Sequence, residues 1–246
     1  HPVLPGQLRP RGVSIGRHVP PDAGELPALL EAFGKGYDIT RLHHPENLAA
    51  VFAAHHRLLW IHPFLDGNGR VARILLQAHL HRLELLGEGL WSMARGLARG
   101  STRYRKLLSA ADARKHDMLD GRGHLNERGL LEFCEFMNET ALDQVRFMGE
   151  ILELETLTER IRRFVETSPD LRPEAFYLLR EAALRGEIPR GEAARVTSLG
   201  ERTARDLVRE LLGEGLLESD SPKGPVRMGF PTSAAEAYFP RLFLPS

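Results

Sequence analysis

The segment 61–73, with the sequence IHPFLDGNGRVAR, gathers the residue types of phosphate chemistry in a short stretch. Gly67 and Gly69 stand where the backbone enters a predicted helix, whose first N–H groups have no intrahelical partners and carry roughly half a positive charge. Glycines at this place allow positive φ and a close approach of a ligand to the main chain. We therefore expect a nest of backbone N–H groups that binds a phosphate, with the side chain of Asn68 as a further donor.

Two arginines and one carboxylate extend this site. Arg70 and Arg73 are three positions apart on the predicted helix, so their guanidinium groups share a face and suit successive phosphates. Asp66 alone would repel a phosphate, and a divalent cation between them removes that conflict. Because Mg²⁺ often binds one carboxylate together with phosphate oxygens, the segment predicts a site for Mg²⁺ and a polyphosphate.

His62 comes just before the glycine-rich turn. An unperturbed histidine accepts a proton near neutral pH, and a hydroxyl that attacks phosphorus needs a base of this kind. Pro63 limits the backbone beside it, and Phe64 can anchor the loop in the core. The order of these residues predicts a histidine base next to a bound phosphate.

Other interpretations of the same residues are weaker. An EF-hand loop would need an acidic residue or Asn where Arg70 stands and Glu where Gln77 stands. The fixed residues of a P-loop are absent. A functionless capped turn would explain the glycines and Asp66, but not the histidine and the two arginines together. Among the eleven histidines, the pairs at 55–56 and 79–81 lack a third ligand at useful spacing for zinc.

Here the sequence resembles a known family. Residues 62–73, HPFLDGNGRVAR, match all eight fixed positions of the Fic family motif H-x-F-x-[DE]-G-N-G-R-x-x-R. The upstream PGQLRPRGVSIG and HVPP, and the later WSMARGLARG and LDGRGHLNERGLLEFCEFM, resemble a bacterial Fic subfamily. The resemblance covers roughly residues 5–165, and a C-terminal winged helix is a common appendage in that family.

The resemblance implies an activity and a role for each motif residue. Fic proteins mostly transfer AMP from ATP to a Ser, Thr or Tyr hydroxyl of a target protein. By this analogy His62 is the base, Asp66 holds Mg²⁺ on the α- and β-phosphates, and Arg73 reaches the γ-phosphate. Four residues would form the anion hole: Gly67, Asn68, Gly69 and Arg70. Transfer of another nucleotide or phosphate group, and removal of AMP, stay open as alternatives.

A second functional segment is expected upstream of the motif. The resemblance implies a flap that holds the target by strand addition, through main-chain hydrogen bonds. We assign this flap to residues 14–18: Ser14, Ile15, Gly16, Arg17 and His18. The alternative interpretation is an ordinary surface hairpin.

The inhibitory motif of many Fic proteins, [ST]-x-x-x-E-[GN], is not found in this sequence. The two Glu-Gly pairs, 88–89 and 214–215, are preceded four positions earlier by Glu84 and Glu210. The chain begins without methionine, in a Pro/Gly-rich stretch. We expect that a segment is missing from the N-terminus and that it carries the inhibitory helix; external regulation is the alternative.

Periodicity predicts a mainly helical fold. Apolar residues recur at helical spacing over 23–33, 44–60, 71–87 and 101–115, and over a long region 126–167 with a break near Gly149. Residues 167–173, TSPDLRP, form the best linker candidate. Beyond it, short helices and two short strands follow in the order of a winged helix. We therefore predict a Fic-type helical bundle with a small β-hairpin flap over 1–168 and a winged-helix domain over 169–246.

Composition limits the partners. Lys plus Arg and Asp plus Glu are balanced at 33 each, so no global basic field indicates nucleic acid. In the predicted recognition helix Arg202, Arg205 and Arg209 are offset by acidic neighbours. DNA binding, protein docking and a homodimer all stay open for the winged helix. The alternative function is therefore a DNA-binding transcriptional regulator with a nucleotide-sensing Fic-like domain.

The single cysteine, Cys134, excludes a disulfide framework and fits a buried helical thiol in a reducing, cytoplasmic setting. No run approaches the ~18 apolar residues of a membrane helix, so no membrane partner is expected.

Overall fold

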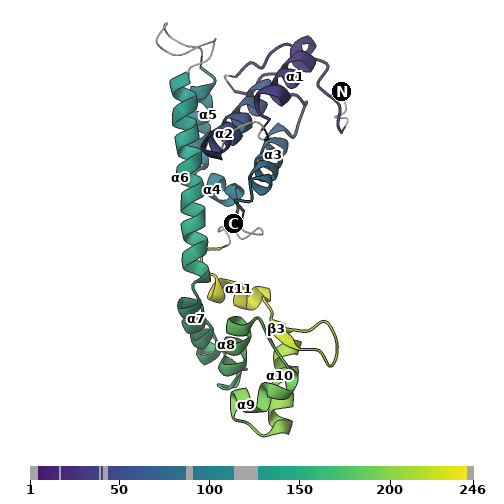
Figure 1. The fold of residues 1–246 in the computed structure, drawn as a ribbon, viewed down its shortest axis with the longest axis vertical. Helices are drawn as coiled ribbons and strands as arrows, with labels where there is room; N and C mark the ends of the chain where they lie inside the picture. Colours follow the sequence, from purple (N-terminus) through teal and green to yellow (C-terminus); the bar gives the residue numbers. More distant parts are fainter. Residues whose placement is uncertain are drawn as a thin grey trace. The chain divides into compact units, whose positions relative to one another are not determined.

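The computed structural model describes residues 5–16, 18–38, 40, 44–86, 91–113 and 127–242. The chain divides into two compact units, His1–Arg146 and Phe147–Ser246, and the helices and strands of both are drawn in Figure 1. The described part is mainly helical, as predicted, and its one sheet is small and lies in the second unit.

The first unit is built from helices. They are η1 (Ala23–Glu25), α1 (Leu26–Gly36), α2 (His44–Ile61), α3 (Asn68–Arg82), α4 (Met93–Arg99), α5 (Ser101–Ala111) and most of α6 (Glu127–Leu152). Helices α2 and α3 pack directly against each other (Figure 1). Buried side chains of α2, α3 and α6 form one core, which includes Phe52, Leu76, Leu80, Phe133 and Met137. The pair α2–α3 therefore carries the 61–73 segment on a packed support.

Several helix bounds differ from the expected ones. Helix α3 begins at Asn68, three residues before the predicted start, and ends at Arg82 in a turn at 83–86. The predicted end at Gly87 lies outside the described residues. Helix α5 ends at Ala111, before the predicted end at residue 115. The break in the long helical region falls at Glu153, between α6 and α7 (Leu154–Thr167), rather than near Gly149.

The flap segment, residues 14–18, is simpler than the predicted hairpin. Within the described residues, Ile15 and His18 form one isolated antiparallel bridge, with N–H···O distances of 2.9 and 3.0 Å. Gly16 has φ +58°, a left-handed conformation that glycine adopts without strain. Arg17 lies outside the described residues. The segment is a tight turn closed by a single pair of hydrogen bonds.

The second unit combines helices with a three-stranded antiparallel sheet of order β1-β3-β2. Its elements are α7 (Leu154–Thr167), α8 (Ala175–Arg185), β1 (Glu187–Ile188), η3 (Arg190–Glu192), α9 (Ala193–Thr197), α10 (Glu201–Gly213), β2 (Leu217–Glu218), β3 (Val226–Met228) and α11 (Thr232–Tyr238). Strand β3 pairs Val226 with Ile188 and Met228 with Leu217. The predicted succession of short helices followed by two strands is present, with β1 and α11 in addition.

The division between the units falls earlier than the predicted boundary at 168–169. It lies at Arg146/Phe147. The reason is the packing of α7, whose Leu157, Ile161 and Val165 are buried in the core of the second unit. The 167–173 linker candidate therefore connects α7 to α8 inside that unit.

None of the helices in the described ranges is long and apolar enough to serve as a membrane span.

Candidate functional site

His62 occupies a strained position directly after α2. Its N–H still donates to the Leu58 carbonyl at 3.0 Å, but its φ is +50°. Pro63 disfavours the right-handed helical conformation at the residue before it, so the helix stops here. A non-glycine residue in the left-handed region costs on the order of 1 kcal/mol and persists only where its surroundings fix it.

Arg9 supplies much of that fixation. This arginine is 2% exposed. Its Nε donates to the His62 carbonyl at 2.8 Å, and its other donors reach the carbonyls of Arg11, Pro21 and Ile61. Its backbone N–H also donates to the Pro63 carbonyl at 2.8 Å. The guanidinium and the backbone N–H of Arg9 together tie the N-terminal segment to the backbone on both sides of His62.

The imidazole of His62 is oriented for accepting a proton. Nδ1 lies 3.2 Å from the Leu59 carbonyl, so Nδ1–H donates there and Nε2 keeps its lone pair. Partial burial lowers the pKa of His62 below the ordinary histidine value; the bond to Leu59 opposes this, while His18 and Arg9 lower it further. A neutral imidazole with a free Nε2 is the form that a general base needs.

The loop between His62 and α3 is closed by Asn68. Its Oδ1 accepts from the Phe64 N–H at 3.0 Å, and its Nδ2 donates to the Phe64 carbonyl at 2.8 Å. The side chain of Asn68 is 3% exposed and satisfied within the loop. This differs from the expectation that its amide donates to a phosphate. What Asn68 offers at the helix start is its backbone N–H.

Helix α3 begins with the predicted glycine geometry. Gly67 is its N-cap, with φ +86°, which other residues rarely adopt. The first intrahelical bond of this turn is Val71 N–H to the Gly67 carbonyl, at 3.0 Å. The backbone N–H groups of Asn68, Gly69 and Arg70 therefore have no acceptor within the helix and form the positive end of its dipole.

The charged side chains of the motif lie over this first turn. A Cβ atom added to Gly67 would lie 3.4 Å from Arg70 Nη2, and one added to Gly69 would lie 3.4 Å from Arg73 Nη1. Asp66 Oδ2 pairs with Arg70 Nη2 at 3.1 Å, and both side chains are 71% exposed. Two cations and one carboxylate thus stand in solvent above unpaired N–H groups, an arrangement suited to a polyphosphate.

The motif region has relatives among known families and proteins. Residues 1–80 match the Fic/DOC family. The match lies in the N-terminal part of the chain, which contains the 61–73 segment. Over 83 residues, 33% of this chain, it is 40% identical to "Protein adenylyltransferase Fic" of Drosophila erecta and 41% identical to that of Drosophila yakuba. The chain spans about a sixth of the length of these relatives, since the match covers 16% of each.

Two solved Fic structures also resemble the chain. A Fic family protein from Desulfovibrio desulfuricans G20 has a TM-score of 0.44 and 21% identity, over 91% of this chain and 62% of that one. A Fic domain containing signaling protein from Bacteroides thetaiotaomicron VPI-5482 has a TM-score of 0.44 and 20% identity, over 59% of this chain and 55% of that one.

A buried layer lies beneath the arginines of the Fic motif. His55, 1% exposed, donates from Nδ1 to the Ala72 carbonyl at 3.0 Å and accepts at Nε2 from the Tyr104 hydroxyl at 2.9 Å. Burial lowers the pKa of His55 to about 4 and raises the pKa of Tyr104 to about 12, and the charge of Arg73 affects both. Tyr104 therefore supports α3 from within the core.

The structure brings the predicted motif residues together and adds one that the sequence did not reveal. Arg9 stands 53 positions before His62 in a Pro/Gly-rich stretch, where no spacing distinguishes it from a surface arginine. The flap segment lies near the motif through His18, whose Nε2 is 2.9 Å from the Trp60 carbonyl. Ser14, Ile15 and Gly16 are exposed.

Proposed function

We propose that this chain is a protein adenylyltransferase that transfers AMP from ATP to a Ser, Thr or Tyr hydroxyl of a target protein. The observation that carries the proposal is the placement of His62. Its Nδ1–H is held by a carbonyl, its Nε2 has no partner within the described residues, and the first N–H groups of α3, which lack an acceptor within the helix, follow after the loop. The naming of the Drosophila relatives supports the same activity.

In this proposal His62 accepts the hydroxyl proton at Nε2 as the hydroxyl oxygen forms a bond to the α-phosphorus. The bond from that phosphorus to the bridging oxygen breaks, and pyrophosphate leaves. The strained backbone fixed by Arg9 holds the imidazole in place, so that little reorganisation is needed on reaching the transition state.

The first turn of α3 would hold the triphosphate. The N–H groups of Asn68, Gly69 and Arg70 face the negative charge, and the two guanidinium groups neutralise it on one face. Asp66 is an exposed carboxylate at this turn, and no cluster of three metal-binding side chains occurs among the described residues. A single carboxylate fits Mg²⁺, which would be held by Asp66 together with phosphate oxygens and water. The ion would offset the negative charge of the phosphates.

The flap segment would hold the target. In the Ile15–His18 bridge, the backbone groups of Ile15 face His18, so by the alternation of an antiparallel ladder those of Ser14 face away from it. An extended stretch of the target could add to this edge through main-chain hydrogen bonds and present its hydroxyl to His62.

The proposal is tested by incubating the chain with ATP labelled at the α-phosphate or at the γ-phosphate. Transfer of AMP predicts label on protein from the α-labelled nucleotide alone. Label from the γ-phosphate would indicate phosphate transfer instead. Label from α-labelled UTP, CTP or GTP in place of ATP would change the nucleotide and keep the mechanism.

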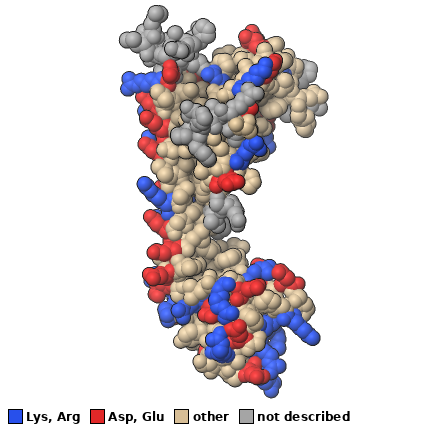
Figure 2. All heavy atoms as spheres, viewed as in Figure 1, with Lys and Arg blue, Asp and Glu red and all other residues tan. Residues whose placement is uncertain are grey.

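A cavity in the second unit supports a second candidate function, the DNA-binding regulator. About 500 Å³ in volume, it is lined by Arg190, Arg205, Arg209 and Lys223, with Glu201 as the acidic member. Four cations against one carboxylate favour an anionic ligand such as the phosphates of DNA. An ion pair offsets part of this positive charge, because Arg209 contacts Asp206 at 2.8 Å. Figure 2 likewise shows basic and acidic side chains interleaved over this unit.

Fluorescence anisotropy with a labelled DNA duplex tests the second candidate. It predicts binding that weakens steeply as salt is raised, and that weakens further when Lys223 and Arg190 are both changed to alanine. Absence of binding at low salt would rule out DNA binding by this unit.

A further inference from the structure

A carboxylate outside the Fic motif connects the flap segment to the core. Asp112, directly after α5, lies 3.0 Å through Oδ1 from His56 Nε2 on α2. Its Oδ2 lies 3.6 Å from Nδ1 of His18, the last residue of the flap segment. The other ring nitrogen of His18, Nε2, is 2.9 Å from the Trp60 carbonyl. The sequence gives no sign of this arrangement, because its three side chains come from three separate segments.

His56 fixes the buried end of the cluster formed by His56, Asp112 and His18. This side chain is 1% exposed, and its Nδ1 has no hydrogen-bond partner among the described residues. A proton on Nδ1 would be a buried donor without an acceptor, so Nε2–H is the group of His56 that faces Asp112. It donates to Oδ1 of Asp112 and thereby turns Oδ2 toward His18.

At the other end, the ring of His18 lies between the Trp60 carbonyl and the Asp112 carboxylate. Nε2–H donates to the Trp60 carbonyl, and Nδ1 faces the Asp112 carboxylate. The side chains of His18 and Asp112 are 14% and 16% exposed, so solvent screens this pair less than a surface ion pair.

We propose that Asp112 is a positioning residue that fixes the flap segment relative to His62. His18 closes the flap bridge through its backbone and is held through its ring by Asp112 and by the carbonyl of Trp60, two residues before His62. Resting on the proposed function, the inference is that Asp112 determines how an added target strand is placed against Nε2 of His62.

The anchoring itself is tested without any activity. Hydrogen–deuterium exchange of the Ile15 and His18 amides, followed by NMR in the full chain, reports opening of the bridge. Asp112→Ala should speed exchange of both amides about tenfold, the effect of losing one charge-assisted contact. Asp143→Ala, which removes an exposed carboxylate on α6, is the matched control and should change neither rate. Unchanged protection in Asp112→Ala would overturn the anchor.

The effect on transfer is tested with the His62→Ala form of this chain as the acceptor protein. Asp112→Ala in the enzyme should raise the KM for this acceptor about tenfold and leave the KM for ATP within about twofold. Asp112→Asn should be milder, because its oxygen still accepts from His56 and its amide still occupies the place next to Nδ1 of His18. Equal changes in both KM values would contradict a role at the flap.

A double-mutant cycle separates positioning from general destabilisation. If Asp112 acts through His18, Asp112→Ala should change the acceptor KM little once His18→Ala is present. Additive effects would overturn the inference. If the unaltered enzyme labels neither this acceptor nor itself, the proposed function fails, and the exchange experiment still decides whether Asp112 anchors the flap.

Discussion

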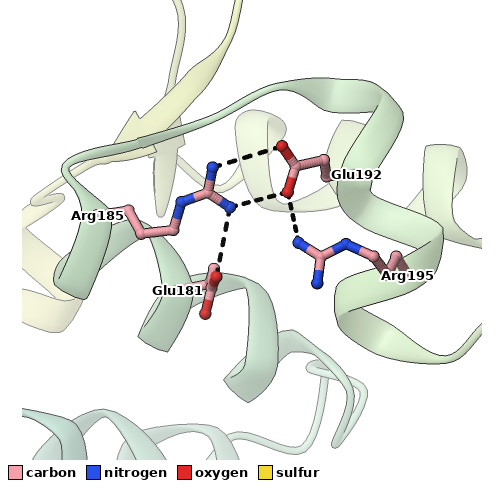
Figure 3. Close-up of polar contacts among 4 residues, drawn as sticks. All are labelled: Glu181, Arg185, Glu192 and Arg195. Carbon is pink, nitrogen blue, oxygen red and sulfur yellow. Dashed lines mark hydrogen bonds and ion pairs between the residues drawn. The ribbon is translucent and has the colours of Figure 1, made fainter.

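The two units each carry an arginine–carboxylate cluster, and the clusters differ in what they connect. In the first unit Asp66 pairs with Arg70 at 3.1 Å, four residues away on the same turn, with both side chains 71% exposed. In the second unit Glu192 accepts from Arg185 of α8 at 2.8 Å and from Arg195 of α9, while Arg185 also reaches Glu181 (Figure 3).

The difference separates a structural cluster from one available to a ligand. Arg185 and Arg195 hold the pKa of Glu192 at about 2 by hydrogen bonding, and the cluster joins two helices. The exposed pair of Asp66 and Arg70 joins nothing beyond its own turn, and such pairs contribute about 0–1 kcal/mol to stability. A ligand can therefore replace it at little cost, and the unpaired N–H groups of α3 lie beneath it.

Asp66→Asn should give the largest split between activity and stability. It removes the carboxylate proposed for Mg²⁺, so transfer should fall about 100-fold, in line with the several kcal/mol that a catalytic metal supplies. The melting temperature should stay within about 2 °C of the unaltered chain, because the pair is exposed. Rates of label transfer and thermal melts measure the two effects. A large loss of stability would show that Asp66, like Glu192, has a structural role.

Arg9→Met should reduce both the rate of transfer and the melting temperature. The side chain volume is roughly kept, but the carbonyls of His62, Ile61, Arg11 and Pro21 lose their donor. Each buried unsatisfied group costs about 1–3 kcal/mol, so the first unit should melt several degrees lower. Transfer should fall at least about tenfold even at temperatures where the variant is folded, because the backbone of His62 is released. Arg11→Met, at an exposed neighbour, is the control.

The pH dependence of transfer reports the surroundings of His62. Burial lowers its pKa, so the neutral form persists to lower pH than for a free histidine. The acidic limb of kcat/KM should therefore lie below about 6.5, the ordinary value. An acidic limb at or above that value would contradict the assigned environment of the base.

Glu192→Gln should give the smallest effect, confined to stability. Because the pKa of Glu192 is lowered to about 2 in the folded chain, its contribution is present at neutral pH and is lost as the pH falls toward 2. The variant should melt slightly lower at pH 7, and the difference should shrink below about pH 4.5. Transfer should be unchanged. Glu166→Gln, an exposed carboxylate on α7, should show no such trend in thermal melts.

The sequence predicted the parts of the site that depend on local geometry. The glycine turn before a helix and the i, i+3 arginines follow from rules within one turn, and Gly67 has the positive φ expected there, although α3 begins three residues before the predicted start. From the sequence we expect the side chain of Asn68 to bind the ligand, whereas it bonds to Phe64 within the loop. An amide can do either. Local sequence does not distinguish these uses.

Long-range contacts were beyond the sequence. Arg9 contacts residues 53 positions away, and Asp112 contacts His56 across 56 positions. Nothing in helical periodicity marks such pairs. The same holds for the boundary between the units, since the apolar face of α7 is visible in the sequence but the core that it joins is not.

The most direct test of the central claim compares the unaltered chain, His62→Ala and His81→Ala after incubation with Mg²⁺ and ATP labelled at the α-phosphate. His81 is an exposed histidine at the end of α3 and serves as the matched control. We expect label on protein for the unaltered chain and His81→Ala, and none for His62→Ala. Equal labelling of His62→Ala would contradict the assignment of His62 as the base.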